Sequence, residues 1–324
     1  MADRPRSSVK HPTNLAMVMT TILIWALAFP VIKVALEDFP PITLALVRFA
    51  IASLFFLVLQ FTIGGGMAAI RALTARLWAL IIIFGVIQSA VTNIAQNIGM
   101  QWTEAGVASI IQSVGPVFAV VLAVMFLGER LTRMKVVGGA LAILGTAGIV
   151  TGGGAVLGSS TLLGNLLMVV TAAAYAVGGT IAKYVLRDVD PTTMMAVGTP
   201  FALIPLAIGA AFEADAMSSL QNASATAWAS VVFLALLATG VTMILWYRVL
   251  ARVELSHLAY FIYLIPVFSV ALAWAILGET ITAVQALFAG VIIAGVAVAQ
   301  RDEPSAVEAV VGAGCEEPPC EDEE

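Results

Sequence analysis

Charged residues are scarce in this chain of 324 residues. Asp, Glu, Lys and Arg together make up 11% of it, against about 25% in soluble globular proteins. Hydrophobic residues make up 61%, above the usual share of about 45–50%. This composition excludes an ordinary water-soluble domain and indicates an integral membrane protein.

Long polar segments are missing as well, except at the two ends. The connections in between are short and use glycine and small polar residues, as turns do, so no soluble domain is inserted. Ten mainly apolar stretches fill the chain, each close to the roughly 20 residues that a spanning helix needs. They are residues 14–36, 42–63, 77–98, 105–127, 132–151, 162–183, 193–212, 227–248, 256–277 and 281–299. The sequence predicts an all-α integral membrane protein with ten transmembrane helices.

Acidic side chains are absent from the interior of these stretches and occur only at helix ends, in loops and in the tails. The spans therefore lack the paired carboxylates or histidine cluster of a membrane-embedded enzyme, and the buried carboxylate of many proton-driven exporters. No phosphate-binding Walker sequence is present, which argues against an ATP-driven pump. We expect no enzymatic activity, no cofactor and no metal. No basic groove with interleaved aromatic residues suggests nucleic acid.

The first apolar stretch also resembles a secretory signal peptide. Arg4, Arg6 and Lys10 precede it, and residues 26–28 (Ala-Leu-Ala) resemble a cleavage site. A retained helix is favoured because the apolar stretch continues to Leu36 and has a counterpart later in the chain.

The C-terminal segment has a different composition. Residues 302–324 hold nine acidic residues, no base and no aromatic residue, which predicts a disordered cytoplasmic tail over 301–324. Both cysteines, Cys315 and Cys320, lie here, and in the cytoplasm they would be reduced thiols.

A constant shift of 150 residues lays the chain over itself. Between Pro116 and Thr132, ten of seventeen positions match their shifted counterparts without a gap. The shift also pairs Lys33 with Lys183 and Thr92 with Thr242. A repeat of this length indicates a duplication. It predicts a five-helix unit at 14–151 and a second at 162–300, after an N-terminal tail at 1–13.

Five helices are an odd number, so the second unit must enter the membrane from the side opposite to the first. The basic residues test this inversion independently, because cytoplasmic loops collect Lys and Arg. With the N-terminus inside, thirteen of the fifteen bases fall on the inner surface, and only Lys33 and Arg48 do not. We predict a multi-pass protein of the cell membrane with both termini in the cytoplasm.

Inverted repeats of this kind are typical of secondary transporters. The fourth and ninth stretches each contain a proline, Pro116 or Pro266, which we expect to act as hinges, and each is followed by Leu-Gly-Glu, at 127–129 and 277–279. This paired arrangement resembles the EamA-type branch of the drug/metabolite transporter superfamily over residues 14–300. The resemblance implies export of small metabolites by alternating access. Aromatic or neutral amino acids are the favoured substrates.

The two Leu-Gly-Glu corners have a simpler structural interpretation. The glycine ends one helix in the left-handed conformation. The glutamates, Glu129 and Glu279, are then expected at the positively polarised N-terminus of the next helix.

Polar residues inside the spans are candidates for a transport pathway, because lipid offers them no hydrogen-bond partners. Helix-to-helix hydrogen bonding is the alternative. The third and fourth stretches carry a broad amide face that we expect to line a cavity: Gln88, Asn93, Gln96, Asn97 and Gln112.

Aromatic residues replace several of these amides in the second unit. The candidates there are Trp246, His257, Tyr260 and Tyr263, and the pair Trp25 and Tyr175 lies at mid-span in the two units. The inversion predicts a pathway that is rich in amides outside and in aromatic residues inside. Trp246 and its neighbour Tyr247 have an alternative role as anchors at the membrane surface.

Arg48 is the one charge placed well inside a span. An arginine there is costly unless it is paired or hydrated, and its planar fork suits a substrate carboxylate. Alternatively, it reaches the surface or bonds carbonyl groups of the protein. Lys33 lies nearer the outer end of its helix and is expected to be an interfacial charge.

The sequence therefore predicts a secondary exporter of amino acids or similar small metabolites. Facilitated export or exchange is the simplest mode, with His257 as a group beside the membrane that titrates near neutrality. A channel, a sensor without transport, and an exporter of drugs, nucleosides or sugars remain as alternatives. The partners expected are a small-molecule substrate and the lipid bilayer.

Overall fold

The computed structural model describes residues 12–127, 132–150, 159–253, 255, 258 and 260–299. These residues form helices and turns, and no strand occurs among them. The predicted tail at 301–324 and the residues His257 and Glu129 lie outside the described residues. The side chains of Tyr260 and Tyr263 are not described either.

The first half of the chain forms long helices that are interrupted in the third and fourth spans. In order, the elements are α1 (Pro12–Ala35), α2 (Pro41–Thr62), α3 (Gly66–Arg71), α4 (Ala75–Gly85), η1 (Val86–Val91), α5 (Thr92–Trp102), α6 (Ala105–Gln112), α7 (Gly115–Leu122), η2 (Ala123–Leu127) and α8 (Arg133–Val150).

The second half repeats much of this order. Its elements are α9 (Ser159–Val185), α10 (Pro191–Ala210), α11 (Ala216–Asn222), α12 (Ala225–Val232), η4 (Phe233–Val241), α13 (Thr242–Leu250), η5 (Tyr260–Tyr263), α15 (Leu264–Leu277) and α16 (Ala283–Ala299).

Seven of the described helices are long and apolar enough to cross a membrane. They cover Pro12–Ala35, Pro41–Thr62, Ala75–Trp102, Ala105–Phe126, Thr161–Val185, Pro191–Ala210 and Ala225–Leu250. Three shorter apolar helices, Val136–Gly148, Leu264–Leu277 and Ala283–Gly295, lie where the remaining predicted stretches were placed. The prediction of an all-helical membrane protein with many spans is thereby confirmed.

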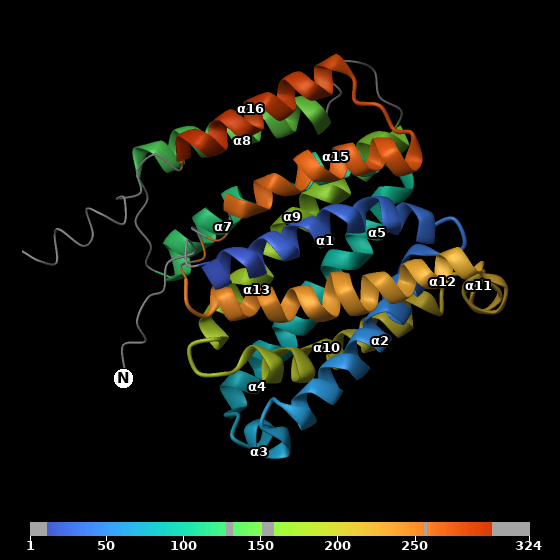
Figure 1. Ribbon diagram of the computed structural model, residues 1–324, viewed down its shortest axis with the longest axis vertical. Coiled ribbons are helices and arrows are strands. Elements are labelled where there is room, and N and C mark those ends of the chain that lie inside the picture. The colour runs from blue at the N-terminus through green and yellow to red at the C-terminus, as the bar shows by residue number, and fades with distance from the viewer. Residues whose placement is uncertain are drawn as a thin grey trace, which may run out of the picture.

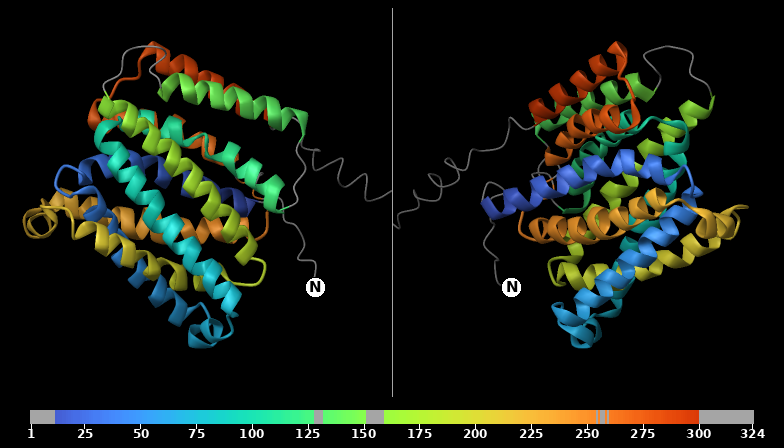
Figure 2. Two further views of the ribbon diagram at one scale, coloured as in Figure 1. Left: turned by 180° about the vertical axis from the view of Figure 1, so that it is seen from behind. Right: turned by 45° about the vertical axis from the view of Figure 1, so that its right-hand side comes forward.

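Equivalent helices of the two halves pack against each other. α8 and α16 lie side by side along one edge of the bundle, and α2 and α10 lie together toward the opposite edge (Figures 1 and 2). Contacts between non-equivalent helices also occur as a matched pair. α5 of the first half packs on α9 of the second, and α13 of the second half packs on α1 of the first. This pattern is the one expected of two copies of one unit related by a two-fold axis.

Small residues allow the closest of these contacts, as is common between helices in lipid. Gly85 at the end of α4 lies against Gly198 of α10, so that a Cβ on Gly85 would overlap the Gly198 carbonyl group. In the α8 and α16 pair, a Cβ on Gly295 would lie 2.6 Å from the carbonyl oxygen of Gly138. Glycine therefore sets the spacing between the two halves.

The third span of each half contains a π-helical segment. η1 ends at Val91 and η4 ends at Val241, positions that the shift of 150 residues pairs. A π-helical turn leaves carbonyl groups without their usual partners and often marks a functional site. The sequence analysis did not predict either segment.

The fourth span was expected to be a continuous helix with a proline in the middle. Instead, α6 ends at Gln112, and Pro116 occupies the first turn of α7. Pro266 similarly lies in the first turn of α15, after the 3₁₀ segment η5. Proline fits a first helical turn because its missing N–H has no partner to lose there. Pro116 therefore follows a break between two helices, and Pro266 follows a change from a 3₁₀-helix to an α-helix.

Carboxylates cap helices of the opposite half. Glu279 accepts hydrogen bonds from the backbone N–H groups of Ala105 (2.9 Å) and Gly106 (3.0 Å), at the start of α6. The sequence analysis placed Glu279 at the N-terminus of the following helix. That expectation was wrong, because Glu279 instead caps α6, which is distant in sequence. The left-handed conformation expected of Gly278 is confirmed by its φ of 69°.

Two further caps join the halves in the same way. Glu213 accepts hydrogen bonds from the N–H groups of Ile42 (2.8 Å) and Thr43 (2.7 Å) at the start of α2, and from the Thr43 hydroxyl (2.7 Å). Asp38 accepts from the N–H of Ser224 (2.8 Å), and hydrogen bonds from Ser224 lower the pKa of this carboxyl group. The interface between the halves is thus tied by charge-assisted bonds.

Candidate functional site: a cavity between the two halves

A cavity of about 100 Å³ lies where both halves meet, several times the space that one water molecule needs. α1, α2, α6, α7 and the third span supply its wall from the first half, and α9 and the eighth and ninth spans from the second. The predicted residues that line it are Trp25, Arg48, Gln88, Asn93, Gln96, Gln112, Pro116, Tyr175 and Trp246. The fold thus brings together residues that lie more than 200 positions apart.

Arg48 is 6% exposed, and its guanidinium group is held by both halves. Nε donates to Oγ1 of Thr239 in η4 (2.8 Å), and Nη1 donates to Oδ1 of Asn93 in α5 (3.1 Å). The Phe49 ring lies beside the cation, 5.4 Å from its carbon to the ring centroid. No Asp or Glu lines the cavity wall. Arg48 is thus a buried cation without an acidic partner among the residues that the structure describes.

The two acceptors of Arg48 are themselves fixed by the π-helical segments. Asn93 donates from Nδ2 to the Gln88 carbonyl oxygen (3.3 Å), and Thr239 donates from Oγ1 to the Leu234 carbonyl oxygen (2.8 Å). Each bond runs to the carbonyl group of the residue five positions earlier, the spacing that a π-helical turn brings together. The irregular backbone therefore orients the side chains that hold Arg48.

Several polar atoms of the cavity wall are buried and have no hydrogen-bond partner within the described part of the chain. They are both amide atoms of Gln88, Oε1 of Gln112 and the hydroxyl oxygen of Tyr175. Leaving such an atom unpaired costs about 1–3 kcal/mol. A polar molecule in the cavity could pair with them.

Three aromatic rings form a cluster on the other part of the wall. Trp25 contacts Tyr175 edge to face, with ring centroids 5.8 Å apart, and contacts Trp246 at 5.0 Å. The Trp25 indole donates to Oγ1 of Thr242 (2.9 Å) and to the Ala238 carbonyl oxygen (3.1 Å). These bonds fix the ring of the first half on the third span of the second.

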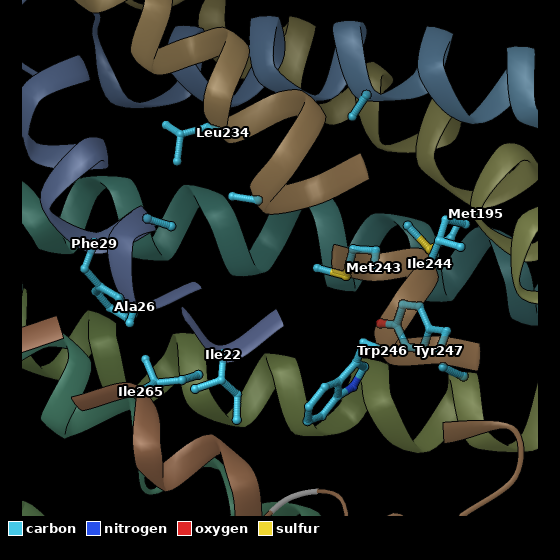
Figure 3. Packing of buried hydrophobic residues seen from close by; sticks show 14 of the residues in the cluster. Ile22, Ala26, Phe29, Met195, Leu234, Met243, Ile244, Trp246, Tyr247 and Ile265 are labelled. Carbon is cyan, nitrogen blue, oxygen red and sulfur yellow. The ribbon is translucent and has the colours of Figure 1, made fainter. Parts of the chain in front are cut away.

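Trp246 and Tyr247 are 3% and 1% exposed, so the alternative role as anchors at the membrane surface is wrong for both. Tyr247 packs edge to face against Phe84, with centroids 5.6 Å apart, and does not line the cavity. Figure 3 shows Met243, Trp246 and Tyr247 on α13, with Phe29 of α1 and Ile265 of α15 on the other side of the cluster. Amides and aromatic rings thus line one common cavity.

Asn97 does not line the cavity, contrary to the expectation from its spacing. Its Nδ2 donates to the carbonyl oxygen of Pro41 (2.9 Å), because the next turn of α5 meets the first residue of α2. Asn97 therefore ties two helices together, as the alternative reading of such amides proposed. Pro266 is buried but is not part of the cavity wall.

The sequence analysis missed the apolar part of the wall, which includes Phe29, Ile32, Met243, Ile262 and Ile265. Nothing in the sequence distinguishes them from apolar residues that face lipid or the core. Thr239 could have been selected as a polar residue inside a span. The sequence analysis did not connect it with Arg48.

Ionisable residues also meet at the end of the bundle where Glu279 caps α6. Burial raises the pKa of Glu104, and the negative charge of Glu279 raises it further, whereas Lys33 lowers it. Glu104 thus keeps its proton to a higher pH than an ordinary glutamate. Protonation would reduce its repulsion with Glu279.

Comparison with known proteins places this arrangement among transporters. The model of the EamA-like transporter family matches residues 13–151 and again 162–300. An uncharacterized transporter of Archaeoglobus fulgidus is 32% identical over 281 residues, which cover 87% of this chain and 96% of the relative.

Two further relatives are named for what they transport. A probable terminal-alkyne amino-acid exporter of Streptantibioticus cattleyicolor is 30% identical over 88% of this chain and 92% of its own. A probable amino-acid metabolite efflux pump of Escherichia coli is 29% identical over 86% of this chain and 92% of its own. A crystal structure with 19% identity and a TM-score of 0.63 covers 88% of this chain and 95% of the other, and shares its fold.

Proposed function

Because the chain belongs to the EamA-like transporter family of the drug/metabolite transporter superfamily, we propose that it exports small metabolites, above all amino acids, across the cytoplasmic membrane. The transport mode is secondary, by alternating access of one central site. The observation that carries the proposal is Arg48, a buried cation without an acidic partner in the described cavity wall. A substrate carboxylate would supply the missing negative charge.

The other walls suit the remaining parts of an amino acid. Oε1 of Gln112 and the Tyr175 hydroxyl are buried and unpaired, and can accept hydrogen bonds from an ammonium group. The apolar residues Phe29, Ile32 and Ile265 can pack on an uncharged side chain. The names of two relatives, an amino-acid exporter and an amino-acid metabolite efflux pump, point to the same class of substrate.

The direct test is a panel of radiolabelled solutes with the purified protein in proteoliposomes. Neutral amino acids such as L-leucine and L-phenylalanine should show saturable uptake, whereas uridine and glucose should not. Flux without saturation would instead identify a channel. Binding without flux would identify a sensor, and saturable uptake of uridine or glucose alone would move the substrate to another class.

Orientation in the membrane is a second part of the proposal. Ten spanning helices in two inverted units, with both termini in the cytoplasm, agree with thirteen of fifteen bases on the inner side. The segment that contains α11 would then face outward. Asn222 is exposed at the end of that helix.

We therefore expect a cysteine at Asn222, in a background without Cys315 and Cys320, to react with a membrane-impermeant thiol reagent in intact cells. A cysteine at Arg71, an exposed residue on the opposite side of the predicted membrane, is the matched control and should react only after permeabilisation. The reverse labelling pattern would contradict the proposed orientation.

Pro116 and Pro266 are proposed as hinges, since each lies in the first turn of an α-helix, Pro116 after a break and Pro266 after a 3₁₀ segment. Alanine at either position should lower the uptake rate more than the yield of folded protein, because it adds a backbone N–H and lets the preceding helix continue. Ala at Pro200, inside α10, is the comparison. Equal losses of uptake rate and folded yield at Pro116 and Pro266 would show that the two prolines serve packing and are not hinges.

A further inference from the structure

A residue outside the cavity wall, Thr239, holds Arg48 in place. Thr239 is fully buried in η4 and is absent from the cavity wall. Its hydroxyl group accepts the Nε–H of Arg48 (2.8 Å) and donates its own hydrogen to the Leu234 carbonyl oxygen (2.8 Å). A hydroxyl with its one hydrogen committed presents only lone pairs to Arg48, so its orientation is fixed.

The second bond of Arg48 comes from the other half of the protein. Asn93 follows η1 and accepts from Nη1 of Arg48 (3.1 Å). A guanidinium group has five N–H donors in one plane, and two fixed bonds set the direction of that plane. The three donors that remain are one N–H of Nη1 and both N–H groups of Nη2, and a carboxylate can pair with one N–H on each of these two nitrogens as a fork.

We propose that Thr239 is a positioning residue for the substrate carboxylate. It orients Arg48 from the π-helical segment of the second half, while Asn93 does so from the first. A carboxylate bound to Arg48 is thereby connected to the irregular backbone of both halves. This inference rests on the proposed function, because it takes Arg48 as the carboxylate ligand.

Thr239 is a cleaner probe of this arrangement than Asn93. Asn93 lines the cavity and can contact substrate directly, so its removal has two effects. A substitution at Thr239 reaches the substrate only through Arg48 or through general loss of packing. The two explanations differ in selectivity, since a packing defect does not distinguish an acid from its amide.

The test compares uptake of L-leucine with that of L-leucinamide in proteoliposomes of Thr239→Val, which keeps the shape of the side chain and removes the hydroxyl group. We expect KM for L-leucine to rise about three- to ten-fold, since one hydrogen bond contributes about 0.5–1.5 kcal/mol and each ten-fold change is about 1.4 kcal/mol. KM for L-leucinamide should change less than two-fold. Thr239→Ser keeps the hydroxyl group and should restore the wild-type KM.

Thr199 provides the matched control. It is another fully buried threonine inside a span, and its Oγ1 has no hydrogen-bond partner in the described structure. Thr199→Val should leave both KM values unchanged.

An unchanged KM for L-leucine in Thr239→Val, or equal losses for acid and amide, would overturn the positioning role. If Arg48→Gln in that case still raises KM for L-leucine and spares L-leucinamide, the proposed function stands without the positioning role of Thr239. If Arg48→Gln affects L-leucine and L-leucinamide equally, the carboxylate assignment itself is wrong.

Discussion

Arg48→Gln is expected to raise KM for L-leucine by roughly ten-fold to a hundred-fold and to leave uptake of L-leucinamide close to that of the wild type. Glutamine keeps a hydrogen-bonding side chain but loses the charge and the fork. A hydrogen bond to a charged group is worth about 1.5–3 kcal/mol, which corresponds to this change in affinity. Initial rates of uptake into proteoliposomes measure both values.

The matched control is Arg133→Gln, because Arg133 is exposed at the start of α8 and does not line the cavity. Asn93→Ala should weaken acid and amide alike, since its amide can serve either substrate. Wild-type uptake of both by an inserted Arg48→Gln protein would show that the carboxylate assignment is wrong. Failure of this variant to insert would make Arg48 structural, and the site would have to be sought around Trp25, Tyr175 and Tyr263.

Gly85→Ala should cause the largest loss of stability among single methyl additions. The new Cβ would overlap the backbone carbonyl of Gly198 in α10, and no side-chain rotation can relieve a contact with backbone. Overpacking costs about 1–3 kcal/mol and occasionally more, so we expect about 3 kcal/mol. Unfolding of the purified protein in detergent measures the loss.

Gly290→Ala is the control for this substitution. Gly290 is exposed in α16, and a Cβ there has nothing within 4 Å. Alanine favours the helix by about 0.5–1 kcal/mol over glycine, so Gly290→Ala should be neutral or stabilising. Similar stability of the two variants would contradict the close approach of α4 and α10.

The sequence predicted the membrane fold well because polar residues are rare in it. In an apolar background each buried polar side chain has to find a partner or a cavity, and Arg48, Gln88 and Gln112 could be selected on that ground alone. The duplication was equally visible, since ten of seventeen positions match in the best segment.

Contacts that are distant in sequence were not predictable in the same way. The spacing rule for an α-helix placed Asn97 on the same face as Asn93. In the structure the start of α2 lies against that turn, and the carbonyl oxygen of Pro41 accepts a hydrogen bond from the Asn97 amide. The local rule for a helix cap assigned Glu279 to the next helix, whereas Glu279 accepts hydrogen bonds from N–H groups at the start of α6 in the other half.

The π-helical segments and the apolar wall left no distinctive pattern. Phe29 and Ile265 could face lipid, core or cavity with the same residue type. The role of Thr239 is visible only from its two hydrogen bonds. The donor of one of them, Arg48, lies 191 positions away in the sequence.

Counterflow tests the central claim of a single carboxylate-binding site that is open to either side in turn. Proteoliposomes are loaded with unlabelled L-leucine and diluted into a trace of radiolabelled L-leucine. Alternating access predicts that label accumulates transiently above its equilibrium level. Unlabelled L-leucine inside should accelerate the entry of label, and Arg48→Gln should abolish the accumulation at the same L-leucine concentration. Entry of label to equilibrium without an overshoot, at a rate independent of L-leucine inside, would contradict the account and identify a channel.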